Sequence, residues 1–106
     1  MKAMLHIVLF LLFSLACVPA SSAHTPYMAC FDNGDGTITC NGEFSDGSSA
    51  SGVPIRVVDR QNRVMIEGTM DADGEYTFRR PAGDFSVIFD AGPGHVVTEK
   101  SDTIVE

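Results

Sequence analysis

The sequence predicts an all-β protein, a single small β-sandwich of six to seven short strands, and three observations lead to this expectation. From residue 37 onward, short runs of β-branched and aromatic residues alternate with clusters of Gly, Pro, Asn and Asp. No segment after residue 23 repeats its apolar residues at the spacing of an amphipathic helix. The chain has 106 residues, which is the size of one domain.

The first 23 residues have the three parts of a cleavable secretory signal peptide. A basic residue at position 2 is followed by the apolar run Leu5–Val18 and then by small residues ending at Ala23. The apolar run is shorter than the roughly 18 to 20 residues that a membrane span needs. We expect cleavage after Ala23, with Ala20 as the alternative site, and a sandwich domain over residues 24–106 with no membrane span of its own.

Export places the domain outside the cytoplasm, in the periplasm or the medium. A lipid anchor on Cys17 is the less favoured alternative, because Ser14 stands where lipoprotein signals usually carry leucine. The domain itself keeps Cys30 and Cys40 as its only cysteines. In an oxidising compartment such a pair usually closes, so we expect a disulfide that stabilises the small fold by roughly 2.5 to 3 kcal/mol.

The charge of the chain is strongly acidic, with 14 Asp and Glu residues against 7 Lys and Arg residues. Removal of the signal peptide also removes Lys2, which makes the domain more acidic still. Such a surface repels nucleic acid and anionic lipid and attracts cations. We therefore expect no nucleic-acid partner.

The expected strands are the runs in which apolar residues alternate with polar ones. In the hairpin around Arg60–Asn62, the returning strand should point Val64 and Ile66 inward. The expected strands are Thr37–Phe44, Val53–Asp59, Arg63–Met70, Glu75–Phe78, Asp84–Asp90, His95–Glu99 and Thr103–Val105.

Two acidic, glycine-containing segments look superficially like calcium loops. These are residues 32–36 and 71–74, and neither has the twelve-residue ligand spacing that ends in glutamate. Turns in which an aspartate side chain bonds the backbone, with glycine in a left-handed conformation, explain both. The Asp71–Gly74 turn should be the connection of a β-hairpin.

Three segments together resemble the prealbumin-like, carboxypeptidase-regulatory type of sandwich. They are Gly52–Val57, Gly68–Phe78 and Ala82–Val87, which match a "G-x-P-V-x-V" strand, a "T-D-A-D-G-x-F/Y-x-F" hairpin and an "A-G-x-Y-x-V" strand. The resemblance implies a prealbumin-like or immunoglobulin-like sandwich. It does not select a function, since such modules serve as adhesin stalks, enzyme appendages and binding domains.

A narrower resemblance concerns Phe89–His95 in a chain whose signal peptide runs into Ala23 and His24. This combination is similar to the small extracytoplasmic accessory proteins of energy-coupling-factor nickel and cobalt transporters. The resemblance implies that the protein captures or delivers metal, and that its partners are membrane components of a metal importer.

Cleavage after Ala23 would make His24 the first residue, with an α-amine and an imidazole that together chelate one metal ion. His95, which follows a Pro-Gly turn, is the only other histidine left, and a sandwich can bring its first segment beside its last hairpin. We expect His24 and His95 to share one divalent ion, with Asp90 as an oxygen ligand. Nickel or cobalt is favoured, and copper or zinc also suits these donors. The alternatives are a frayed terminus at His24 and a surface histidine at His95.

No catalytic arrangement is recognisable in the sequence. The two domain cysteines are assigned to the disulfide, no serine lies in a nucleophile elbow, and the carboxylates fall in loops. We expect no enzymatic activity. The alternative to a metal-binding accessory protein is a structural or protein-binding sandwich without a metal ligand.

Overall fold

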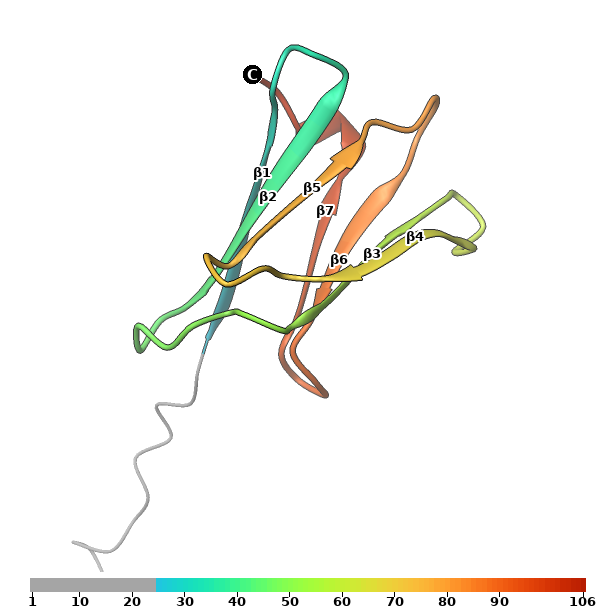
Figure 1. Ribbon diagram of the computed structural model, residues 1–106. Helices are drawn as coiled ribbons and strands as arrows, with labels where there is room; N and C mark the ends of the chain where they lie inside the picture. Colours follow the sequence, from blue (N-terminus) through green and yellow to red (C-terminus); the bar gives the residue numbers. More distant parts are fainter. Residues whose placement is uncertain (1–24) are drawn as a thin grey trace, which may run out of the picture.

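The computed structural model describes residues 25–106, which form a β-sandwich of seven antiparallel strands and one short 3-10 helix (Figure 1). One sheet has three strands in the order β1-β2-β5, and the other has four in the order β4-β3-β6-β7. This confirms the predicted all-β sandwich. The elements are β1 (Pro26–Asp32), β2 (Thr37–Phe44), β3 (Pro54–Val58), β4 (Val64–Thr69), β5 (Glu75–Arg79), β6 (Ser86–Asp90), β7 (Val96–Lys100) and η1 (Ser101–Thr103).

The strand order is that of a Greek key, in which the chain changes sheets three times. Hairpins join β1 to β2, β3 to β4 and β6 to β7, while the other connections cross between the sheets. An immunoglobulin-like sandwich likewise pairs its first, second and fifth strands in one sheet. The Asp71–Gly74 turn therefore joins two sheets and is not a hairpin connection, so that expectation was wrong. Its local hydrogen bonds are those of a tight turn, and these do not decide which sheet the next strand joins.

Strand β1 lies in a part of the chain for which the sequence predicts no strand. It pairs with β2 in a register that places Cys30 opposite Cys40. The missed signal is an apolar stretch in which both faces carry large side chains, so no alternation of apolar and polar residues marks it. Met28 packs against the core, whereas Tyr27 and Phe31 are exposed.

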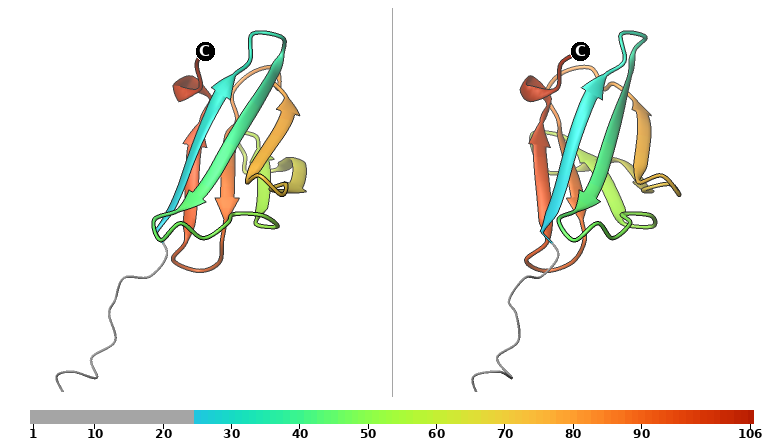
Figure 2. Two further views of the ribbon diagram at one scale, coloured as in Figure 1. Left: turned by 60° about the vertical axis from the view of Figure 1, so that its left-hand side comes forward. Right: turned by 90° about the vertical axis from the view of Figure 1, so that its left-hand side faces the viewer.

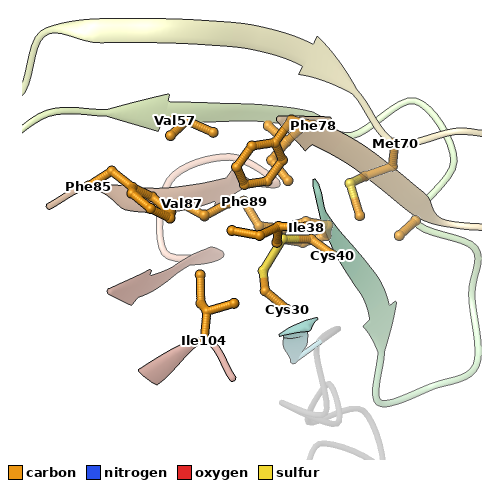
Figure 3. Close-up of a cluster of buried hydrophobic side chains, with 12 residues drawn as sticks. Cys30, Ile38, Cys40, Val57, Met70, Phe78, Phe85, Val87, Phe89 and Ile104 are labelled. Atoms are coloured by element: carbon orange, nitrogen blue, oxygen red, sulfur yellow. A yellow bond between two sulfur atoms is a disulfide. The ribbon is translucent and has the colours of Figure 1, made fainter. Parts of the chain in front are cut away.

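The core fills the space between the two sheets (Figure 3). Phe89 and Ile38 are its largest fully buried side chains. Gly42 on β2 makes room for Phe89, because a Cβ atom there would lie 2.5 Å from the Phe89 ring. The buried cluster comprises Cys30, Ile38, Cys40, Ala50, Ile55, Val57, Met70, Phe78, Phe85, Val87, Phe89 and Ile104.

Strand β4 departs from the expected inward alternation. Ile66 packs against the core, but Val64 is 49% exposed, so its expected inward position was wrong. The pairing of β3 with β4 shifts between Val57 and Val58, which marks a β-bulge. An extra residue in one strand reverses the side on which the following side chains point, and it thereby turns Val64 outward.

The end of the chain forms no closing strand at Thr103–Val105, contrary to expectation. Instead, η1 turns the chain after β7, and only one backbone bond, from the Asp32 N–H to the Val105 carbonyl, links the last residues to β1. Ile104 is nevertheless buried in the core. The apolar residues at the end of the chain thus contribute a side chain to the core but do not form a strand.

Each open side of the sandwich is covered by a side chain. On one side, Glu99 of β7 accepts a hydrogen bond from the Cys30 N–H at 3.1 Å. On the other, the Tyr76 ring lies against Gly68 of β4, where a Cβ atom would be 2.4 Å from the ring. These contacts fix how the two sheets sit against each other and therefore where their connecting loops meet.

No helix in residues 25–106 is long and apolar enough to cross a membrane. The predicted signal peptide, the alternative anchor at Cys17 and the proposed ligand His24 lie outside the described residues.

Candidate functional site

His95 sits in the hairpin between β6 and β7, whose turn is built by glycines. Gly92 and Gly94 both have positive φ angles, of 106° and 78°, which glycine adopts without strain. The His95 N–H donates to the Gly92 carbonyl and the His95 carbonyl accepts from Ala91. This places the imidazole Nδ1 atom 3.1 Å from the Pro93 carbonyl oxygen. When Nδ1 carries the proton, that bond orients the ring and leaves the Nε2 lone pair for a metal ion.

A shallow hollow of about 210 Å³ lies beside this histidine, and it is lined by Phe44, Ser48, Ala91 and His95. Its walls come from the loop after β2 and from the β6–β7 hairpin. Segments some fifty residues apart in the sequence therefore meet at one end of the sandwich, as Figure 2 shows. We refer to the loops at this end, residues 25, 45–53, 71–74 and 91–95, as the His95 end.

The first described residue joins the same end. The Thr25 carbonyl accepts a hydrogen bond from the Ser45 N–H at 2.9 Å, and the Thr25 N–H donates to the Ser45 hydroxyl at 3.0 Å. Ser45 stands three residues before Ser48, which lines the hollow with His95. The covalent attachment point of His24 is thus brought to the same end as His95.

Asp90 takes part in the structure of the hairpin. Its Oδ2 atom accepts a hydrogen bond from Arg56 at 3.0 Å, and its Oδ1 atom accepts one from the Gly92 N–H at 3.0 Å. The Arg56 side chain and then the Gly92 backbone lower the pKa of Asp90 from its ordinary 3.8. Both carboxylate oxygens are therefore engaged, and a metal ion bound by Asp90 would have to share them with Arg56 and Gly92.

Among residues 25–106, no three His, Cys, Asp or Glu side chains gather in a way that could hold a metal ion. Cys30 and Cys40 form the predicted disulfide, which joins adjacent strands of the three-stranded sheet. Neither sulfur is thus a free thiolate. In the described part of the chain, His95 is the one imidazole that a divalent ion can use.

The two acidic segments that resemble calcium loops are turns. Asp32 bonds the Gly34 N–H, and Asp35 bonds both the N–H and the hydroxyl of Thr37. The Thr37 hydroxyl, and after it the Thr37 backbone, lower the pKa of Asp35. In the second segment, Asp71 accepts from two backbone N–H groups further along the chain. These carboxylates satisfy the backbone of their own turns.

Two further surface features were not anticipated from the sequence. A hollow of about 320 Å³ lies at the far end of β7 from His95, and its lining includes Arg60, Lys100, Asp84 and Asp102. On the outer side of the three-stranded sheet, Tyr27 and Phe31 are 53% and 52% exposed. Once β1 is known to be a strand with Cys30 inward, the outward direction of both rings follows from the alternation of side chains.

Comparison of the chain with known protein families, with curated proteins and with solved structures finds no match, so the geometry described above is what a proposal of function rests on.

Proposed function

We propose that the protein is an exported metal-binding accessory that captures nickel or cobalt at its His95 end and presents the ion to membrane components of an uptake transporter. The observation that carries the proposal is the bonding of Thr25 to Ser45, which anchors the start of the domain at the end where His95 lies. The chain then offers three nitrogen donors, namely the α-amine and imidazole of His24 and the Nε2 atom of His95. Nitrogen donors of this kind bind first-row divalent ions.

The charge of the His95 end supports capture of a cation. Its loops carry Asp46, Asp71 and Asp73 and no lysine or arginine. A locally negative field raises the concentration of cations near the surface and speeds their encounter with a site.

Asp90 belongs to the proposed site as a weaker ligand than the three nitrogens. Each carboxylate oxygen has a second lone pair, so Asp90 can contact an ion without releasing Arg56 or Gly92. The nearby Arg56 cation opposes a second positive charge, however. We therefore assign most of the affinity to His24 and His95.

Isothermal titration of Ni(II) and Co(II) into protein that begins at His24 tests the proposal. His95→Ala, or one extra residue ahead of His24, should weaken binding at least about tenfold, because each removes a nitrogen donor. Val96→Ala is the matched control, since Val96 is the adjacent residue, is 48% exposed and has no donor atom. Affinity should also fall in acid, because protons compete with the metal ion for the nitrogen donors. Unchanged affinity in both donor variants would show that His24 and His95 do not share a metal ion.

A structural or protein-binding sandwich without a metal is the second candidate. The engagement of both Asp90 oxygens, one by Arg56 of β3 and one by Gly92, favours it, because that aspartate then has a structural reason to be present. The neighbouring genes distinguish the two candidates. Importer components favour metal capture, and genes for surface or secretion proteins favour a structural role.

A further inference from the structure

The outer face of the three-stranded sheet carries two exposed aromatic rings, those of Tyr27 and Phe31. The strands of this sheet, β1, β2 and β5, lie side by side in the right-hand view of Figure 2. Cys30, Ile38 and Phe78 are buried, so the residues that alternate with them on β1, β2 and β5 point outward. Phe31, Thr39 and Thr77 are register partners and form one row across the sheet. The next row begins with Ala29 and Asn41, and Tyr27 lies beyond it on β1.

Hydrogen bonds hold the polar part of this face in a fixed arrangement. The Asn33 amide donates to the hydroxyls of Thr37 and Thr39, at 3.0 and 2.9 Å. The Thr39 and Thr77 hydroxyls are 2.8 Å apart, and this bond uses only one of their two hydrogens. Whichever threonine donates, the other hydroxyl keeps a hydrogen for an outside acceptor. Asn33 also keeps its amide oxygen.

The row made by Phe31, Thr39 and Thr77 is neutral, in contrast with the acidic chain as a whole. The charged side chains of the same face lie in the neighbouring rows, with Glu75 and Arg79 on either side of Thr77 along β5 and Glu43 opposite Tyr27. A neutral ligand therefore avoids both the repulsion that the acidic protein exerts on anions and the cost of stripping water from an unpaired charge.

The spacing of the two rings distinguishes this face from a typical protein-docking surface. Four residues along a strand place them about 13 Å apart, and Ala29 between them carries only a methyl group, so the two rings stand apart from each other. An isolated ring beside fixed hydroxyl and amide groups suits a sugar, whose apolar ring face stacks on the aromatic while its hydroxyls bond the polar groups. We propose that this face binds a neutral oligosaccharide. Phe31 would be the platform on which one sugar ring stacks, and the side chains of Thr39, Thr77 and Asn33 would hydrogen-bond to its hydroxyls. Tyr27 would be a second platform for a sugar unit further along the oligosaccharide.

Titration of the isotope-labelled exported protein with cellohexaose, chitohexaose and maltohexaose, followed by NMR, tests the proposal. At least one sugar should shift the amide signals of the Phe31, Thr39 and Thr77 row. Phe31→Ala should weaken that binding about tenfold, and Thr77→Val, which keeps the side-chain shape, about fivefold. Phe31 and Tyr27 are both exposed, so Tyr27→Ala provides a second variant that preserves the core.

Val96→Ala is the control, because it removes an equally exposed apolar side chain from the four-stranded sheet. It should leave sugar affinity unchanged. The proposal is overturned if none of the three sugars shifts the row at millimolar concentration, or if Phe31→Ala and Val96→Ala weaken binding equally. It is also overturned if the row shifts with protein concentration alone, which would make this face a contact between copies of the chain.

Discussion

Arg80 shows how much of the fold can depend on one side chain. Its guanidinium donates to Asp32 at 2.9 Å and to the carbonyls of Ser101 and Ile104 at 3.3 Å, and it lies 5.6 Å above the centre of the Phe85 ring. The residue therefore ties β1, the segment before β6 and the C-terminal segment together. Only the planar, multiple-donor geometry of arginine reaches all of these acceptors at once.

Replacing Arg80 by alanine should destabilise the protein more than replacing the adjacent Arg79 by alanine. We expect Arg80→Ala to lower the free energy of unfolding by about 2 to 3 kcal/mol, because it removes a charged hydrogen bond to Asp32 and two hydrogen bonds to backbone carbonyls. Arg80→Lys should recover only part of this. Urea unfolding measures both, and Arg79→Ala at the exposed adjacent position should change stability by less than about 0.5 kcal/mol. Equal effects at both positions would contradict the role given to Arg80.

The Asp90 carboxylate leads to a prediction about the stability of the protein at low pH. Its pKa is lowered in the folded state, first by the Arg56 side chain and then by the Gly92 backbone. The resulting stabilisation is complete above the unfolded-state value, near 3.9, and is lost as pH falls through the lower folded value. In Arg56→Gln, carboxyl NMR should show the pKa of Asp90 moving up toward 3.8. A value that does not change would mean that Arg56 does not stabilise the carboxylate.

At the scale of strands, the sequence pattern identifies correctly the strands that have one buried face and one more exposed face. Residues 37–44 and 86–90 alternate buried and more exposed positions, and both were expected as strands from that alternation. Strand β1 carries apolar residues on both faces and was missed. Val64 was placed on the wrong face because a bulge depends on pairing with a distant strand, which leaves no mark in the local pattern.

The candidate site divides in the same way. The disulfide was expected from the number and spacing of cysteines and is present. The approach of the β6–β7 hairpin to the loop after β2 is set by the order in which strands join sheets, so the residues beside His95 could not be named in advance. The Arg56 partner of Asp90 was hidden for the same reason, since it comes from a strand 34 residues away in the sequence.

The disulfide should account for a large part of the stability of the three-stranded sheet. It joins β1 to the central strand β2 across a separation of 10 residues, and both half-cystines are buried. Reduction should lower the free energy of unfolding by about 2.5 to 3 kcal/mol, chiefly by freeing the unfolded chain. Urea titration with and without reductant measures this. A variant with both Cys30→Ala and Cys40→Ala should not respond to reductant, and thiol labelling of the untreated protein should be negligible.

At the scale of the whole molecule, the predicted processing of the chain decides whether the proposed metal site exists. Amino-terminal sequencing of the exported protein should begin at His24, directly before the residue that bonds to Ser45. A free α-amine on His24 is then available to a metal. A start at Ser21, or a lipid on Cys17, would eliminate the amine donor and with it the three-nitrogen site. Neither outcome would affect the sugar-binding proposal, which uses only residues 27–77.

The contact between Glu99 and Cys30 affects how the protein behaves at high concentration. An uncovered strand at the border of a sheet invites a strand from another molecule, and growth of such pairs leads to aggregates. Here the Cys30 N–H on β1 already has its acceptor, the Asp32 N–H is taken by the end of the chain, and the acceptor at Cys30 is a carboxylate. A strand arriving at that border finds two of its backbone donors occupied and a negative charge in its path, which favours a protein that stays dispersed when it is concentrated.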